Sequence, residues 1–188
     1  MALRPKDSLQ DPSRLLPGYS YLHIGVGGRE TLMVRGARPA AAPETAGDDY
    51  WYSAQAEMLQ LRQGRIWRVL GMTTEWRHQS AMPPAWSQLP PTGEPVAWQR
   101  QAHRMPGYRW HETDHIQTRR LPQAPSPALA TRWPQAQWFE DEVQSLDGEG
   151  RRWAFKQHFA LLHDQVAYSE QCIARDLCLQ LTALPNKP

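Results

Sequence analysis

The sequence has no long hydrophobic run, little net charge and only two cysteines among its 188 residues. No stretch approaches the ~20 apolar residues that a helix needs to cross a bilayer. The formal net charge is +2, and no basic run alternates with aromatic residues, so we expect no nucleic-acid partner. The chain also has no nucleophile elbow, no P-loop and no specific cysteine–histidine pattern. We therefore expect neither enzymatic activity nor a cofactor.

A recognisable export signal is missing as well. Residues 1–16 are polar and contain no apolar stretch of the kind that signal peptides carry. We expect residues 1–17, which include three prolines, to form a flexible leader or tether. The remaining residues, 18–188, are long enough to form a single β domain with a core of its own.

Tryptophan and proline, in contrast, are frequent, with nine and seventeen copies. This composition is typical of short strands joined by rigid loops, because proline lacks a backbone donor and breaks helices. The clearest pattern spans residues 49–76. It contains a ring-rich stretch at 50–52, an alternating stretch at 58–62, the turn Gln63-Gly64 and a β-branched and aromatic return at 65–70. We interpret it as strand, strand, turn and strand.

Hairpin patterns recur along the rest of the chain. Further strands are predicted at 21–26, 30–36, 94–103, 108–121, 137–145, 152–161, 166–173 and 177–184. Residues 73–79 fit a short helical turn that Thr74 could cap, and 80–93 and 123–130 read as proline-rich connections. The prediction is an all-β fold, an antiparallel meander of hairpins curled into a barrel or half-barrel with few short helical turns.

The order of these motifs resembles a known family. The ring-rich strand is followed by Met58-Leu59-Gln60-Leu61, Gly64-Arg65 and Leu70-Gly71-Met72. Together they are similar to the YjbF/GfcB family of group 4 capsule and exopolysaccharide lipoproteins. The C-terminal part resembles the same family at 138–143, at Arg152-Trp153 and at 177–184. The resemblance covers most of the chain from Pro17 onward and is weakest from 80 to 133.

The resemblance implies an all-β accessory protein of the periplasm and outer membrane that assists secretion or assembly of an exopolysaccharide or capsule. Its implied partners are proteins of the same secretion locus, including an outer-membrane protein, and the polysaccharide itself. Membrane attachment would be only through a lipid anchor on a segment that this sequence lacks. A cytoplasmic protein and a purely structural envelope lipoprotein remain the alternatives. Residues 161–184, near the expected C-terminal edge, could pair with a partner strand.

Tryptophans outside the expected strands are the best candidates for binding. Trp76 and Trp86 lie in or beside predicted loops, where a flat ring is free to stack on a sugar or a partner. Trp67 and Trp153 fall within predicted strands, and we expect them in the core.

The alternative function is a zinc-dependent hydrolase. Residues 111–115 match the H-E-x-x-H motif, with His111 and His115 as metal ligands and Glu112 as the base. That chemistry requires a helix, which places all three side chains together. The aromatic and β-branched neighbours favour a strand instead, on which Glu112 points away from both histidines. We therefore expect no metal site here.

Cys172 and Cys178 flank a candidate hairpin turn at 174–176. Facing positions on neighbouring strands can be bridged in some pairings, so a disulfide is one interpretation. The other is a pair of small apolar side chains, one of them buried.

Overall fold

The computed structural model describes residues 15–39, 47–79, 82–106, 109–146, 150–175 and 177–185, without the side chains of 109–111. Twelve strands within these ranges form one closed antiparallel barrel. Their bounds are β1 Tyr21–Val26, β2 Arg29–Gly36, β3 Asp48–Ser53, β4 Met58–Arg62, β5 Arg65–Leu70, β6 Glu75–His78, β7 Val96–Met105, β8 Arg109–Leu121, β9 Gln137–Leu146, β10 Arg152–Leu162, β11 Gln165–Ala174 and β12 Leu177–Ala183. The all-β barrel prediction is confirmed.

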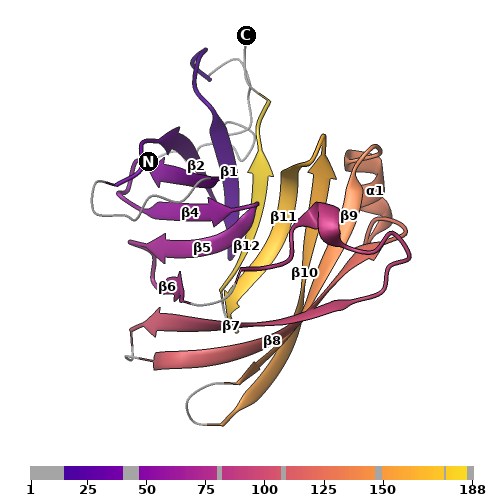
Figure 1. Ribbon diagram of the computed structural model, residues 1–188. Helices are drawn as coiled ribbons and strands as arrows, with labels where there is room; N and C mark the ends of the chain where they lie inside the picture. Colours follow the sequence, from indigo (N-terminus) through magenta and orange to yellow (C-terminus); the bar gives the residue numbers. More distant parts are fainter. Residues whose placement is uncertain are drawn as a thin grey trace.

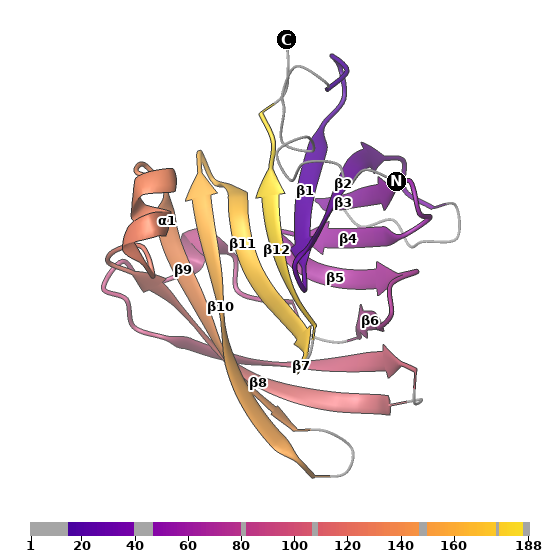
Figure 2. The same ribbon diagram turned by 180° about the vertical axis from the view of Figure 1, so that it is seen from behind.

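The strands follow chain order around the ring, and β1 closes it against β12. Strands β1 and β10–β12 run upright in Figures 1 and 2, whereas β4, β5 and β7 run across them. The expectation of a free edge at 161–184 is wrong, because β11 lies between β10 and β12, and β12 lies between β11 and β1. Their backbone groups are already paired with neighbours, so a partner strand finds no open ladder there.

Alternation along the strands explains where the core forms. Ile24 faces Leu181 across β1 and β12, and Trp51 faces Leu59 across β3 and β4. The largest buried apolar cluster consists of Leu22, Ile24, Met33, Trp51, Leu59, Leu61, Ile66, Val69, Trp76, Ala102, Ile173, Ala174, Leu177, Leu179 and Leu181. Burying one side chain of the larger aliphatic types contributes roughly 1.5–3 kcal/mol before entropy is counted. This cluster fills the barrel interior beside β1–β7, β11 and β12.

The turn between β4 and β5 forms as predicted. Gln63 and Gly64 both adopt positive φ, at 51° and 75°, as a two-residue hairpin turn of this hand requires. A bulge follows, because Leu61 faces Ile66 while Gln60 faces Arg68, which leaves Trp67 outside the regular alternation.

This bulge explains why one core prediction is wrong. Trp67 is only half-buried, and its ring stacks on His78 with centroids 3.7 Å apart. Trp153 is also half-buried and stacks on Phe155 at 4.2 Å. Neither tryptophan belongs to the described apolar clusters.

The helical turn expected at 73–79 is also wrong. Residues 75–78 form β6, which pairs with β7 from Glu75 opposite Met105 to His78 opposite Ala102. Thr74 does not cap a helix here, because pairing with β7 satisfies the backbone hydrogen-bonding groups of residues 75–78.

Two short helices lie in the connections that the structure describes. The 3-10 helix η3, Trp86–Gln88, belongs to the crossover from β6 to β7. Helix α1, Pro127–Arg132, was expected as an irregular connection; Ser126 accepts a hydrogen bond from the backbone N–H of Leu129 at 3.3 Å and caps it. A serine followed by proline is a helix-start signal that could have revealed α1. No helix in the described ranges is long and apolar enough to span a membrane.

Candidate binding site at the barrel mouth

An open cavity of about 780 Å³ lies at one end of the barrel. Its walls come from the start of β1, the adjoining ends of β2 and β3, the β4–β5 turn, η3 and the β10–β11 turn. Three aromatic residues, Tyr21, Trp51 and Trp86, line it together with the charged residues Arg35, Asp49 and Asp164. We call this cavity the mouth. Its size and its mixture of rings with a few polar groups are typical of small-ligand sites.

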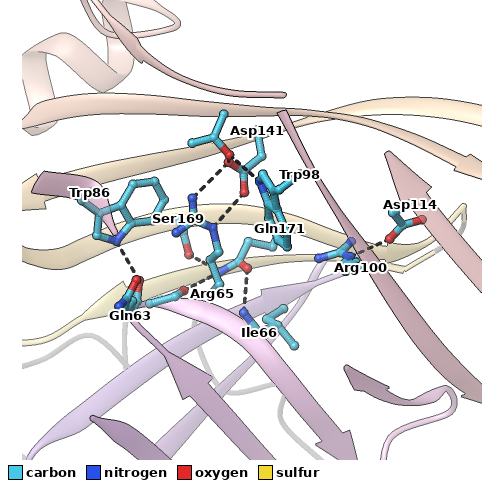
Figure 3. Close-up of polar contacts among 12 residues, drawn as sticks. Gln63, Arg65, Ile66, Trp86, Trp98, Arg100, Asp114, Asp141, Ser169 and Gln171 are labelled. Atoms are coloured by element: carbon cyan, nitrogen blue, oxygen red, sulfur yellow. Dashed lines mark hydrogen bonds and ion pairs between the residues drawn. The ribbon is translucent and has the colours of Figure 1, made fainter. Parts of the chain in front are cut away.

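Trp86 is held in the mouth from several sides. Its indole Nε1 donates a hydrogen bond to the backbone oxygen of Gln63 at 2.9 Å. The guanidinium carbon of Arg65 lies 3.5 Å from its ring centroid, and the rings of Phe139 and Phe159 lie at 5.1 and 4.8 Å. Figure 3 shows the bond from Trp86 to Gln63 and Arg65 beside the ring. Because these contacts fix the half-buried ring, its position in the lining is preorganised.

Behind Trp86 lies a buried ion pair. Arg65 donates to Asp141 through Nε at 3.0 Å and Nη2 at 3.2 Å. Thr118 Oγ1 donates to the same carboxylate at 2.6 Å, and Trp98 Nε1 donates to Thr118 at 2.8 Å. Burial lowers the pKa of Arg65, while Asp141 opposes the shift by stabilising the cation. The charge of Arg65 is therefore compensated inside the barrel.

Gln171 on β11 anchors the β4–β5 turn from below this ion pair. Its Oε1 accepts from the backbone N–H of Ile66 at 2.8 Å. Its Nε2 donates to the backbone oxygen of Gly64 at 2.8 Å and to Ser169 Oγ at 2.9 Å. Figure 3 shows these bonds beside Arg65. They join strands far apart in sequence and hold the turn that carries Gln63, the acceptor for Trp86.

The rim of the mouth carries paired and unpaired charge. Arg35 Nη2 forms an ion pair with Asp49 across β2 and β3. Burial raises the pKa of Asp49, against the opposing effect of Arg35 and with a further increase from Asp48. Asp164 lies in the β10–β11 turn with φ at 63°, a conformation that aspartate tolerates better than most residues. Its carboxylate is exposed to solvent.

The two predicted binding tryptophans have different positions. Trp86 lines the mouth. Trp76 lies on β6 instead of in a loop, and only 2% of its surface is exposed. Its ring packs in the apolar cluster and presents little surface to a ligand. Sequence reasoning does not select Tyr21 and Trp51, because alternation shows that a ring lies on a strand but not that it ends at an opening.

The H-E-x-x-H segment lies on β8, a strand. Glu112 is 2% exposed and pairs with Arg104 at 2.7 Å. His115 is exposed on the other face, where its Nδ1 lies 3.1 Å from Gln99 Nε2. The side chain of His111 lies outside the described part. Glu112 and His115 thus diverge, and the described residues contain no group of three His, Cys, Asp or Glu placed to hold a metal ion.

Cys172 and Cys178 face each other across β11 and β12 and form a disulfide. Cys178 is exposed and Cys172 is half-buried, so the bridge lies on the outside of the barrel. Residue 176, in the expected turn, lies outside the described residues.

The fold and the mouth together define a closed antiparallel β barrel with a ligand-sized opening at one end. A solved structure of this architecture is that of the hypothetical lipoprotein YmcC from Escherichia coli (K12), which matches with a TM-score of 0.69. The alignment covers 97% of this chain and 91% of that chain at 15% identity. At this identity the likeness shows a shared fold. No family model and no curated protein matches the sequence.

Proposed function

We propose that this protein is an envelope lipoprotein-type accessory protein of the YjbF/GfcB kind, which assists secretion or assembly of an exopolysaccharide or capsule in the periplasm or at the outer membrane. The motifs around Gly64-Arg65 and Leu70-Gly71-Met72 support this proposal from the sequence. The fold shared with a protein described as a hypothetical lipoprotein supports it from the structure. Its action is binding, not catalysis.

The observation that carries the proposal is the aromatic mouth. Tyr21, Trp51 and Trp86, from three different elements, line one cavity. Trp86 is half-buried, whereas Tyr21 and Trp51 are 8% and 7% exposed and contribute only their edges to the lining. Aromatic rings offer flat apolar surface to the C–H faces of sugar rings, while their polar atoms keep hydrogen-bonding capacity. A polysaccharide segment bound there would meet these rings and the polar rim together.

The barrel acts as a docking site, not a conduit. Its interior beneath the mouth is filled by the apolar cluster and by the Arg65–Asp141 pair. A polymer would therefore rest at the mouth, and proteins of the secretion locus would act on the outer surface of the barrel.

The test is a titration of the purified protein with exopolysaccharide from its source organism, followed by tryptophan fluorescence and by calorimetry. We expect saturable binding that is weakened about tenfold in Trp86→Ala, which corresponds to about 1.4 kcal/mol. Trp153→Ala is the matched control, because Trp153 is also half-buried and stacked but does not line the mouth. Far-ultraviolet circular dichroism verifies that both variants fold.

A flat titration with authentic polymer would rule out direct glycan binding and leave a role through protein partners. Equal loss of affinity in Trp86→Ala and Trp153→Ala would show that the mouth is not the binding site.

A further inference from the structure

We infer that the mouth binds an uncharged stretch of glycan and discriminates against uronate sugars. This inference rests on the proposed function and specifies the class of ligand for the same cavity. It is based on the charged side chains that line the mouth and on which of them already form ion pairs within the protein.

Among the described residues that line the mouth, Arg35 is the only cation. Its guanidinium forms an ion pair with Asp49, so part of its positive charge is already compensated by a carboxylate of the protein. The other nearby guanidinium, Arg65, is 3% exposed, lies behind the Trp86 ring and bonds to Asp141. Asp49 thus partly neutralises the exposed Arg35, and Arg65 is buried, so a uronate gains little net attraction from either arginine.

Asp164 gives the described lining of the mouth an excess of negative charge. With Asp49 it makes two carboxylates against the one guanidinium of Arg35 in the lining. A ligand carboxylate would be repelled by this excess, whereas a sugar hydroxyl could donate a hydrogen bond to Asp164. The remaining polar side chains of the lining are uncharged, among them Gln63, Ser87 and Gln165, and all three can donate to and accept from hydroxyls.

A second cavity shows the opposite charge. It has a volume of about 670 Å³ and lies beside α1, where Arg120 is the only charged residue in the described lining. Trp133 and Trp138 line it, so aromatic rings are common to both cavities. The contrast shows that the negative excess belongs to the mouth and does not follow from aromatic lining in general.

The experiment compares chemically matched forms of one glycan. Short oligosaccharides from the source exopolysaccharide are prepared in a carboxyl-reduced form and in a form oxidised to carboxylates at their primary hydroxyls. Both are titrated by calorimetry at one ionic strength. We expect the reduced form to bind and the oxidised form to bind about tenfold more weakly, close to the effect of one like-charge contact in a largely aqueous environment.

Asp164→Asn supplies the decisive variant, because asparagine accepts the positive φ of this turn and the change removes only charge. It should reduce the ratio between the affinities for the reduced and the oxidised form, and this ratio is the quantity that is compared with the wild type. Trp133→Phe is the control at the second cavity and should leave both affinities unchanged.

Equal or tighter binding of the oxidised form, or a gap that Asp164→Asn leaves unchanged, would overturn the inference. If unmodified polymer still binds in a manner that depends on Trp86, the proposed function survives that result. If neither the unmodified polymer nor either derivative binds, the inference and the proposed glycan binding both fall.

Discussion

Gly64 lies against Val166, and this contact joins the β4–β5 turn to β11 beside the mouth. A Cβ built on Gly64 would lie 2.3 Å from Val166 Cγ2 and 2.4 Å from its Cβ. The residue also has φ at 75°, where a side chain is strained. Glycine is therefore required twice, for the close approach and for the turn that presents Gln63 to Trp86.

Gly64→Ala should destabilise the protein through both effects. Gly28→Ala is the matched control, since Gly28 has φ at 80° but a Cβ there would meet nothing within 4 Å. The control should cost about 1 kcal/mol for backbone strain, and Gly64→Ala about 1–3 kcal/mol more for overpacking. Urea unfolding measures both, and equal losses would show that the contact with Val166 is easily relieved.

Buried and exposed ion pairs should respond differently to truncation. Asp141→Ala leaves the guanidinium of Arg65 buried without its carboxylate and should cost about 3–5 kcal/mol. Asp49→Ala breaks a pair whose side chains are 38% and 55% exposed, and should cost at most about 1 kcal/mol. Chemical unfolding of the two variants under the same conditions provides the comparison.

The double variant Arg65→Met with Asp141→Leu separates charge from packing. Replacing both partners by apolar groups removes the desolvation penalty, so this variant should be more stable than Asp141→Ala. If the double variant is the less stable of the two, the polar network with Thr118 contributes more than the ion pair itself.

His158 links two carboxylates across the outer face of β9–β11. Its Nε2 lies 3.2 Å from Glu140 Oε2 and its Nδ1 lies 3.5 Å from Glu170 Oε2. The hydrogen bond to Glu170 raises the pKa of His158; burial opposes it and Glu140 adds to it. The bond from His158 lowers the pKa of Glu170 despite burial. Burial raises the pKa of Glu140, but bonds from Arg119 and Lys156 outweigh it and leave this pKa lowered.

His158 should stabilise the fold while it is protonated, and this stabilisation should be lost when it deprotonates at higher pH. Its contribution is complete below the ordinary histidine pKa of 6.5 and disappears as pH rises through the raised folded-state pKa. As the pH rises from 6.5 through the raised folded-state pKa, the free energy of unfolding should therefore fall more in the wild type than in His158→Gln. His115→Gln, which removes an exposed histidine, should behave as the wild type does.

Glu140 and Glu170 should have the opposite pH dependence, because they stabilise the fold only while they are ionised. The folded-state pKa values of Glu140 and Glu170 are lowered. Their contribution to the free energy of unfolding is therefore present above pH 4.5 and is lost as the pH falls through those lowered values. A free energy of unfolding that rose steadily as the pH fell below 4.5 would show that the two glutamates do not stabilise the fold through this network.

Reduction of the Cys172–Cys178 bridge should have a small effect. The cysteines are six positions apart, and closing so short a loop restricts the unfolded chain by at most about 2 kcal/mol. Unfolding with and without a thiol reductant measures this, and the double variant Cys172→Ser with Cys178→Ser should be insensitive to the reductant. A loss well above this limit would show that the bridge also organises the native β11–β12 hairpin.

The sequence predicted local features wherever one residue type restricts the backbone. Gln63-Gly64 required a turn, since glycine tolerates positive φ, and alternation at Met58–Arg62 required a strand. The local pattern gave a wrong prediction where pairing with a distant segment determines the structure. Residues 75–78 were expected to form a helical turn but pair with β7 as a strand. Trp86 could be selected because it lies in a connection, but its neighbours Tyr21 and Trp51 could not.

By itself, therefore, the sequence determined an antiparallel β protein rich in hairpins, because side-chain alternation and turn residues act over a few positions. Only the tertiary structure decided that β1 closes on β12, that Arg65 meets Asp141 and that three aromatic residues reach one mouth. Arg65 and Asp141 are 76 positions apart, and no local pattern specifies such a pairing. Their meeting depends on the curvature and register of the whole ring, which only the packed chain defines.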